Sequence, residues 1–117
     1  MNKIMVLPFH TGEIDPSGSW TSRAIDLSKL SNEGRLSIQP IVTGDGTAKI
    51  EVLASNNGVD FIDTENDVVI GLTVAAYAPI IIDTTMLPYC RWFKIVVTET
   101  AGVALETVTL ELSLFVQ

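Results

Sequence analysis

Cysteine and histidine are almost missing from this sequence, which contains one of each, Cys90 and His10. A single cysteine cannot form a disulfide within the chain, so packing and not cross-linking must stabilise the fold. We expect Cys90, in the apolar segment YCRWFKIVV (89–97), to be a small packed residue of a strand. The scarcity of both residue types also excludes a zinc site made from them.

Basic residues are scarce as well. Seven Lys and Arg stand against 14 Asp and Glu, which gives a formal net charge of −7. The basic residues occur singly, so the concentrated positive patch that nucleic-acid binding needs is missing. Hydrophobic residues make up 47% of the chain and charged residues 18%, too apolar a composition for a disordered protein. This composition suggests that other subunits cover part of the apolar surface.

Long hydrophobic runs are absent. The run that begins at Ile4 stops at Pro8, and the longest run, residues 74–82, is interrupted by Pro79. Both are too short for a signal-peptide core or a membrane span. We therefore expect a protein that is synthesised in the cytoplasm and does not bind a membrane.

Sustained helical periodicity is also missing, whereas alternation with a period of two residues is widespread. It is clearest in segment 107–116 and recurs in segments 47–55 and 91–98, which is typical of strands with one buried face. The side chains expected to face the core are Ile50, Val52, Phe93, Ile95, Leu110 and Leu112.

The sequence predicts a single all-β domain over residues 1–117, an antiparallel β-sandwich or jelly roll of about eight strands. The expected strands are 3–9, 19–26, 35–43, 47–55, 67–74, 77–83, 90–98 and 104–116. Residues 1–12 are expected to form an extended arm or an edge strand. Asp-Gly in segment 43–47 predicts a hairpin, and segments 55–58 and 99–102 predict turns. Pro40 should place its strand at a sheet edge or a bulge.

Catalytic and metal-binding patterns are weak. A Ser-His-Asp triad would have to use His10, and no serine lies in a Gly-x-Ser-x-Gly pattern. Asp60, Asp63, Glu65 and Asp67 offer oxygen ligands for calcium, but their spacing does not match an EF-hand loop. We interpret them as solvated loop charge, and we predict no enzyme, no cofactor and no metal site. A small hydrolase within the sandwich is a third hypothesis about function.

Aromatic and apolar residues suggest contact surfaces instead. Trp20, Tyr77, Tyr89 and Trp92 could stack on a ligand such as a sugar, although a core or interface role is favoured for them. Several strands carry apolar residues on both sides, whereas isolated antiparallel sandwiches keep their outer faces polar. The expected interface residues are Leu53, Trp92, Val96, Phe115, Ile4 and Val6.

A set of loose patterns covers about two thirds of the chain. They are Gly18–Trp20, Ser22, Ala24–Leu27, Ser37–Gln39, Ser55–Gly58, Phe61, Arg91 and Lys94–Thr98. In this order they resemble small β-sandwich virion proteins of tailed bacteriophages. The resemblance implies a capsid decoration (cement) protein, or a related head or tail accessory subunit, made in the host cytoplasm. Such a protein binds the major capsid lattice, catalyses no reaction and forms a homo-oligomer, with a trimer favoured because capsid lattices offer threefold positions.

The Ser55–Gly58 turn followed by Phe61 also resembles an element of discoidin-like carbohydrate-binding sandwiches. That resemblance implies an alternative function, a carbohydrate-binding or host-attachment module of discoidin or jelly-roll type. It also implies that Phe61 anchors the turn to the core. Asn57 stands where both patterns prefer Asp, which weakens any case for a cation at this turn.

Overall fold

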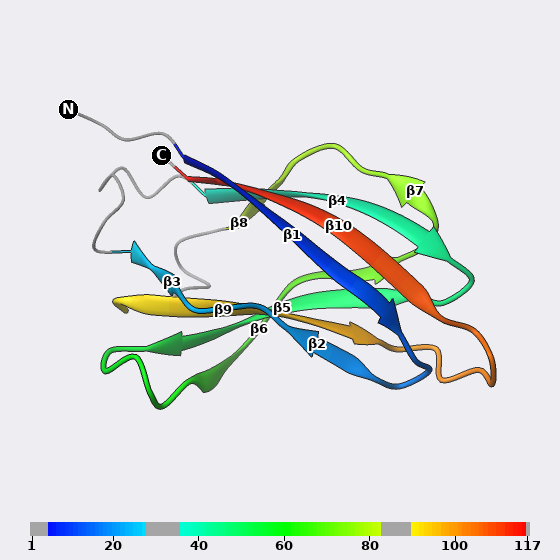
Figure 1. Cartoon of the computed structure of the whole chain (residues 1–117), viewed down its shortest axis with the longest axis horizontal. Coiled ribbons are helices and arrows are strands. Elements are labelled where there is room, and N and C mark those ends of the chain that lie inside the picture. The colour runs from blue at the N-terminus through cyan, green and yellow to red at the C-terminus, as the bar shows by residue number, and fades with distance from the viewer. Residues whose placement is uncertain (1–4, 28–35, 83–89, 117) are drawn as a thin grey trace.

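Ten strands, all paired antiparallel, make up most of what the computed structural model describes, residues 5–27, 36–82 and 90–116 (Figure 1). These ranges contain no α-helix. The strands are β1 (Met5–Ile14), β2 (Ser19–Thr21), β3 (Ile25–Asp26), β4 (Leu36–Gly44), β5 (Ala48–Ser55), β6 (Ile62–Leu72), β7 (Ala75–Ala76), β8 (Ile80–Ile82), β9 (Trp92–Glu99) and β10 (Val108–Val116).

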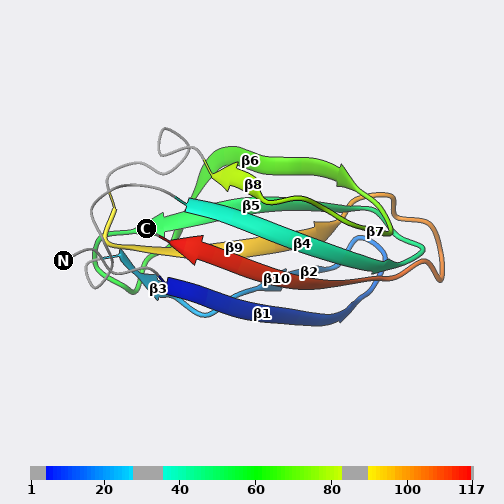
Figure 2. The same cartoon turned by 90° about the horizontal axis from the view of Figure 1, so that it is seen from above.

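The strands form two sheets that pack face to face. Sheet A has the order β1-β10-β4, with β7 and β8 both on the far side of β4. Sheet B has the order β9-β5-β6, with β2 and β3 both on the far side of β9. Because β2 and β3 share one neighbour, and β7 and β8 another, the ten described strands occupy eight strand positions. This order is that of a jelly roll, and Figure 2 shows sheet A from its outer side. The predicted fold class is confirmed.

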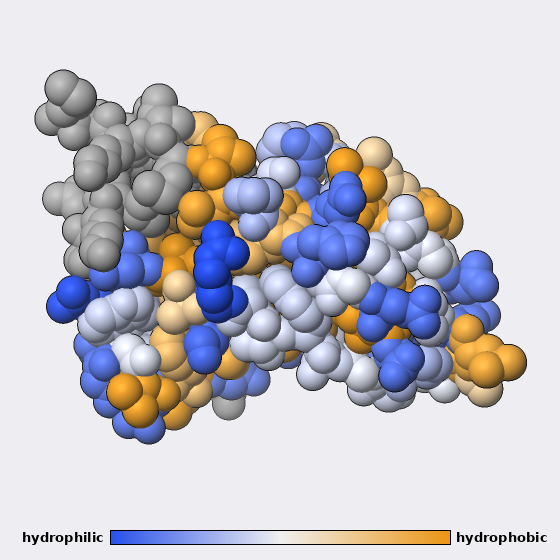
Figure 3. Space-filling model, viewed as in Figure 1, coloured by the Kyte–Doolittle hydropathy of each residue, from blue (hydrophilic) through white to orange (hydrophobic). Residues whose placement is uncertain are grey.

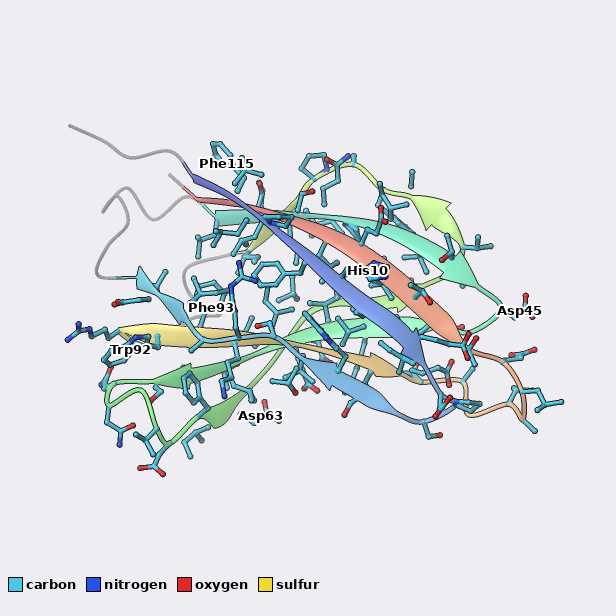
Figure 4. The ribbon with its side chains drawn as sticks, viewed as in Figure 1. His10, Asp45, Asp63, Trp92, Phe93 and Phe115 are labelled. Carbon is cyan, nitrogen blue, oxygen red and sulfur yellow. The ribbon has the colours of Figure 1, made fainter. Side chains whose placement is uncertain are left out.

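The core lies between the sheets and follows the predicted alternation. The six side chains expected to face inward are each at most 1% exposed. Figure 4 places Phe93 between the two layers. The register in segments 47–55, 91–98 and 107–116 is therefore confirmed, since a shift by one residue would turn these side chains outward.

The predicted hairpin at residues 43–47 is wrong. β4 belongs to sheet A and β5 to sheet B, so this turn carries the chain from one sheet to the other. Gly44 has a φ of +100°, and a Cβ there would lie 2.4 Å from the carbonyl oxygen of Thr107. The Asp-Gly signal thus marks a tight corner and not a pairing of neighbouring strands.

Three other described connections cross between the sheets at the same end of the molecule, on the right in Figure 1. They are the turn 15–18 between β1 and β2, the short link 73–74 between β6 and β7, and the loop 100–107 between β9 and β10. Four described crossings therefore meet at one end of the sandwich.

Strand β1 is longer than predicted. It continues to Ile14 through a bulge between His10 and Glu13. Within the bulge the hydroxyl of Thr11 accepts the backbone N–H of Leu110 at 3.0 Å. A side chain thus replaces a backbone acceptor, so pairing continues past the irregular residues. β1 is the edge strand of sheet A, and its residues pair with the chain's own β10.

Pro40 lies in an interior strand, not at an edge, because β4 has β10 on one side and β7 and β8 on the other. β8 pairs with residues 36–38 and β7 with residues 41–42. Pro40 falls between them, and its carbonyl accepts the N–H of Tyr77 at 3.0 Å. The missing N–H of proline therefore coincides with the break between two short strands.

The acidic segment 60–67 was predicted to be a loop, but most of it is strand, since β6 begins at Ile62. Its pairing with β5 has three irregularities between Ala48 and Leu53. These bulges break the simple alternation and hide the strand from a period-two pattern.

Candidate interaction surfaces

The outer face of sheet A carries few charges. Its side chains alternate with the core residues of β1, β10, β4 and β8. They include Val6, Pro8, His10, Glu13, Ser37, Gln39, Ile41, Thr43, Ile81, Thr109, Glu111, Ser113 and Phe115. Among the described residues, His10, Glu13 and Glu111 are the ionisable side chains of this face. His10 Nδ1 lies 3.9 Å from Glu111 Oε1.

One transverse row of this face is mostly apolar. The register places Val6 beside Phe115, Phe115 beside Ser37, and Ser37 beside Ile81. Val6 is 60% exposed and Ile81 77% exposed. Figure 4 shows Phe115 pointing away from the interior, and Figure 3 shows hydrophobic residues over the start of β1 and the end of β10. Two of the predicted interface residues, Val6 and Phe115, therefore share one row, whereas Ile4 lies outside the described residues.

The outer face of sheet B is charged. Lys49 Nζ lies 4.0 Å from Glu51 Oε2 and 3.8 Å from Asp67 Oδ1. Arg91 Nε lies 3.6 Å from Asp26 Oδ1.

The predicted interface residues of sheet B are largely covered by their own chain. Val96 is only 9% exposed, between Thr21 and Glu51 on the neighbouring strands. Leu53 and Trp92 are half-buried. The apolar surface on this face is therefore smaller than the sequence suggested.

The aromatic residues proposed as a ligand platform are dispersed. Trp20 pairs with the buried Val97 and packs edge to face on Phe9, with ring centroids 6.2 Å apart. Trp20 therefore belongs to the edge of the core and not to an outer platform.

The other two described candidates are engaged in local contacts. The hydroxyl of Tyr77 donates to the carbonyl of Thr73 at 3.1 Å and accepts its N–H at 3.0 Å. The guanidinium carbon of Arg91 lies 4.3 Å from the ring centroid of Trp92, and Gly58 also lies against this ring. Tyr89 lies outside the described residues.

The turn Ser55–Gly58 closes the β5–β6 hairpin as predicted. Ser55 Oγ accepts the N–H of Gly58 at 3.0 Å, and Asn57 Oδ1 accepts the N–H groups of Val59 and Asp60, each at 2.9 Å. Gly58 has a φ of +75°, which glycine adopts without strain. Side-chain acceptors thus replace backbone pairing at the hairpin tip.

The expectation that Phe61 anchors this turn to the core is wrong. The ring of Phe61 lies under Lys94, with Nζ 4.2 Å from the centroid. Lys94 pairs with Leu53 on the outer face of sheet B, on the opposite side from the buried Phe93 and Ile95. Instead, hydrogen bonds join the turn to the residue before β9: the N–H of Arg91 donates to the carbonyl of Ser55 at 3.2 Å and to Asn56 Oδ1 at 3.3 Å.

A buried carboxylate, missed by the sequence analysis, holds the end where the chain crosses between sheets. Glu99, at the end of β9, is 1% exposed. Its Oε1 accepts the N–H groups of Ser17 at 3.2 Å and Gly102 at 2.7 Å, and its Oε2 accepts those of Thr47 at 2.8 Å and Ala101 at 3.1 Å. One side chain therefore bonds to three of the four described crossings at this end.

Burial alone would raise the pKa of Glu99, because a carboxylate loses hydration there. The N–H groups of Thr47, Gly102, Ser17 and Ala101 outweigh this effect and lower the pKa of Glu99 to about 2. Glu99 is thus ionised at neutral pH and is satisfied by the backbone. This is the arrangement of a structural carboxylate and not of an acid–base catalyst.

A shallow cleft of about 250 Å³ lies beside the β5–β6 hairpin. Ser55, Ile62, Asp63, Thr64 and Cys90 contribute to its lining. Burial raises the pKa of the Cys90 thiol, which a backbone hydrogen bond from Ser55 only partly offsets, so the reactive thiolate is disfavoured at neutral pH.

Within residues 5–27, 36–82 and 90–116, no group of three or more His, Cys, Asp and Glu side chains is placed to hold a metal ion. The same residues contain no helix long and apolar enough to cross a membrane. No protein-family model matches the chain. No curated protein matches it either.

Proposed function

We propose that this protein is a non-enzymatic structural protein of a bacteriophage virion, a capsid decoration protein that attaches to a preformed lattice and stabilises it. The observation that carries the proposal is the outer face of sheet A, which exposes the apolar side chains of Val6, Ile41 and Ile81 and has few charges, as an assembly surface does. A jelly-roll sandwich with such a face is suited to adhesion by surface contact.

Several of the residues that carry the resemblance to phage virion proteins lie at turns or strand breaks of this jelly roll. Gly18 accepts the N–H of Glu99 at the first crossing. Ser22 Oγ accepts the N–H of Ile95 at 2.9 Å and so continues the edge of sheet B between β2 and β3. Ser55 and Gly58 form the hairpin turn. The likeness therefore supports a shared fold, and the role in the virion rests on the proposal.

The arrangement of the aromatic residues favours this proposal over a carbohydrate-binding module. A sugar-stacking platform needs an open aromatic face beside polar groups. Trp20 packs on the core, Tyr77 is bonded to Thr73, and Trp92 is covered by Arg91 and Gly58.

Mass spectrometry of purified particles tests the proposal. Virions from cells that carry this gene should contain the chain in a fixed ratio to the major capsid protein, and particles made without the gene should lose heat resistance. Absence of the chain from purified particles would overturn the proposal. Binding of the isolated protein to a glycan array, abolished by Trp92→Ala, would support the carbohydrate-binding alternative instead.

A further inference from the structure

One row on the outer face of sheet A is self-complementary. It runs across four strands in the order Val6, Phe115, Ser37 and Ile81. A second copy of the row, running in the opposite direction, would fit against the first. Large side chains stand at Val6, Phe115 and Ile81, and a small one stands at Ser37. Reversing the row sets Phe115 opposite Ser37 and Val6 opposite Ile81. A large ring then meets a small residue, the pairing that lets two sheet faces interdigitate.

We infer that a second copy of this chain covers the outer face of sheet A, packed face to face about a two-fold axis parallel to the strands. Such an axis reverses the row, so that Phe115 of each copy lies over Ser37 of the other. A two-fold contact of this kind uses the same patch on both copies and closes at two subunits. The inference goes beyond the proposed function, on which it rests for the biological role: it assigns this face to pairing between copies, so contact with the lattice falls to other surfaces of the pair.

The distribution of charge favours a second copy over other occupants. Each chain carries a net charge of −7, so two copies repel unless the contact contains few acidic groups. The outer face of sheet A meets this condition, because Glu13 and Glu111 are its described acids and His10 lies beside Glu111. The outer face of sheet B instead carries paired charges of both signs, Lys49 with Glu51 and Asp67, and Arg91 with Asp26, which a covering copy would have to desolvate.

The area of this face is close to what a small interface needs. Four strand positions about 4.8 Å apart, with β4 and β10 nine residues long, give a flat area of roughly 600 Å². The side chains add accessible surface to this flat area, and a standard interface buries roughly 800 Å² per partner. Exposed apolar residues at both ends of the row, Val6 and Ile81, would be removed from water by this contact.

Sedimentation velocity on the full chain at micromolar concentration provides the first test. The expected mass is twice 12.7 kDa. Phe115→Glu and Ile81→Glu should each raise the dissociation constant at least about 30-fold. Ile70→Glu is the matched control, because Ile70 is 67% exposed on β6 of sheet B and should not affect association. Ile81, 77% exposed, tolerates a charge in the folded monomer, so its result stands even if Phe115→Glu disturbs folding.

Cross-linking tests the direction of the row. In a Cys90→Ser background, Val6→Cys and Ile81→Cys chains are prepared separately and treated with a bismaleimide that spans the roughly 10 Å between stacked sheets. Mixed chains should give a covalent heterodimer, whereas each variant alone should give little product.

A monomer or a trimer in sedimentation, a dimer insensitive to both glutamate variants, or equal cross-linking of the single variants would each overturn the inference. These outcomes are distinct from failure of the proposed function, which is decided by the presence of the chain in virions. A monomer found in virions would leave the proposed function intact, and a dimer absent from virions would leave the pairing intact.

Discussion

The carboxylate oxygen Oε2 of Glu99 accepts the backbone N–H of Thr47 at 2.8 Å, across 52 residues of sequence. Thr47 lies just after the β4–β5 corner and Glu99 at the end of β9. In return, the N–H of Thr100 donates to the carbonyl of Thr47 at 2.8 Å. This connection ties the β4–β5 corner to the end of β9, at the end of the molecule where four described connections cross between the sheets.

Replacing Glu99 with alanine should destabilise the protein strongly. The change leaves four backbone N–H groups without their charged acceptor, and unmade hydrogen bonds to charged groups are costly. We expect a loss of about 3 kcal/mol or more in the free energy of unfolding, measured by chemical denaturation. Asp45→Ala is the control, because Asp45 is exposed in the same corner and should change stability by less than about 0.5 kcal/mol. Equal effects of the two variants would contradict a special role for Glu99.

The same carboxylate should make stability depend on pH under acidic conditions. The pKa of Glu99 is about 2 in the folded protein, against an ordinary value of 4.5. A lowered folded-state pKa contributes stability that is fully present above pH 4.5 and is lost as pH falls from there toward 2.

Melting temperatures of the wild type and Glu99→Gln, recorded between pH 7 and pH 2, measure this contribution. The gap between the two proteins should be widest at neutral pH and should narrow below pH 4.5. A gap that stays constant across the range would show that ionisation of Glu99 does not contribute.

Gly44→Ala should be much more destabilising than Gly71→Ala. Both glycines have positive φ, +100° and +72°. An added Cβ at Gly44 would lie 2.4 Å from the carbonyl oxygen of Thr107, whereas at Gly71 it would meet nothing within 4 Å. We expect a loss of about 1 kcal/mol for Gly71→Ala from backbone strain alone, and at least twice that for Gly44→Ala. Similar losses would mean that the corner can move away from β10.

The sequence was sufficient to predict the layers and the core because burial on one face imposes a period of two. Phe93, Ile95, Leu110 and Leu112 follow that period in strands without bulges. β1 and β6 were predicted with wrong limits because each contains a bulge, at Thr11 and Gly12 in β1 and opposite residues 48–53 in β6. A bulge shifts the alternation and so removes the signal.

Features that depend on distant residues could not be predicted in this way. Asp-Gly at 45–46 indicates a tight turn, but whether it joins paired strands or crosses between sheets depends on the distant strands with which its flanks pair, β10 for β4 and β9 for β5. No sequence pattern indicated that Glu99 is buried, because glutamate is usually exposed and the hydrogen-bond partners of Glu99 are backbone groups. Similarly, Val96 looked like an interface residue, yet neighbouring strands cover it.

The last prediction is that calcium does not bind at the acidic segment 60–67. Two of its carboxylates already have partners: Asp60 Oδ2 accepts Asn57 Nδ2 at 2.9 Å, and Asp67 lies 3.8 Å from Lys49 Nζ. Calcium needs six to eight oxygen ligands and would have to displace these groups. Millimolar calcium should therefore leave the melting temperature unchanged, since only a ligand that binds the folded state raises it. Asp63→Asn, at an exposed position of β6, should behave like the wild type with and without the ion. A rise of several degrees with calcium that Asp63→Asn removes would establish a cation site on this strand and contradict the prediction.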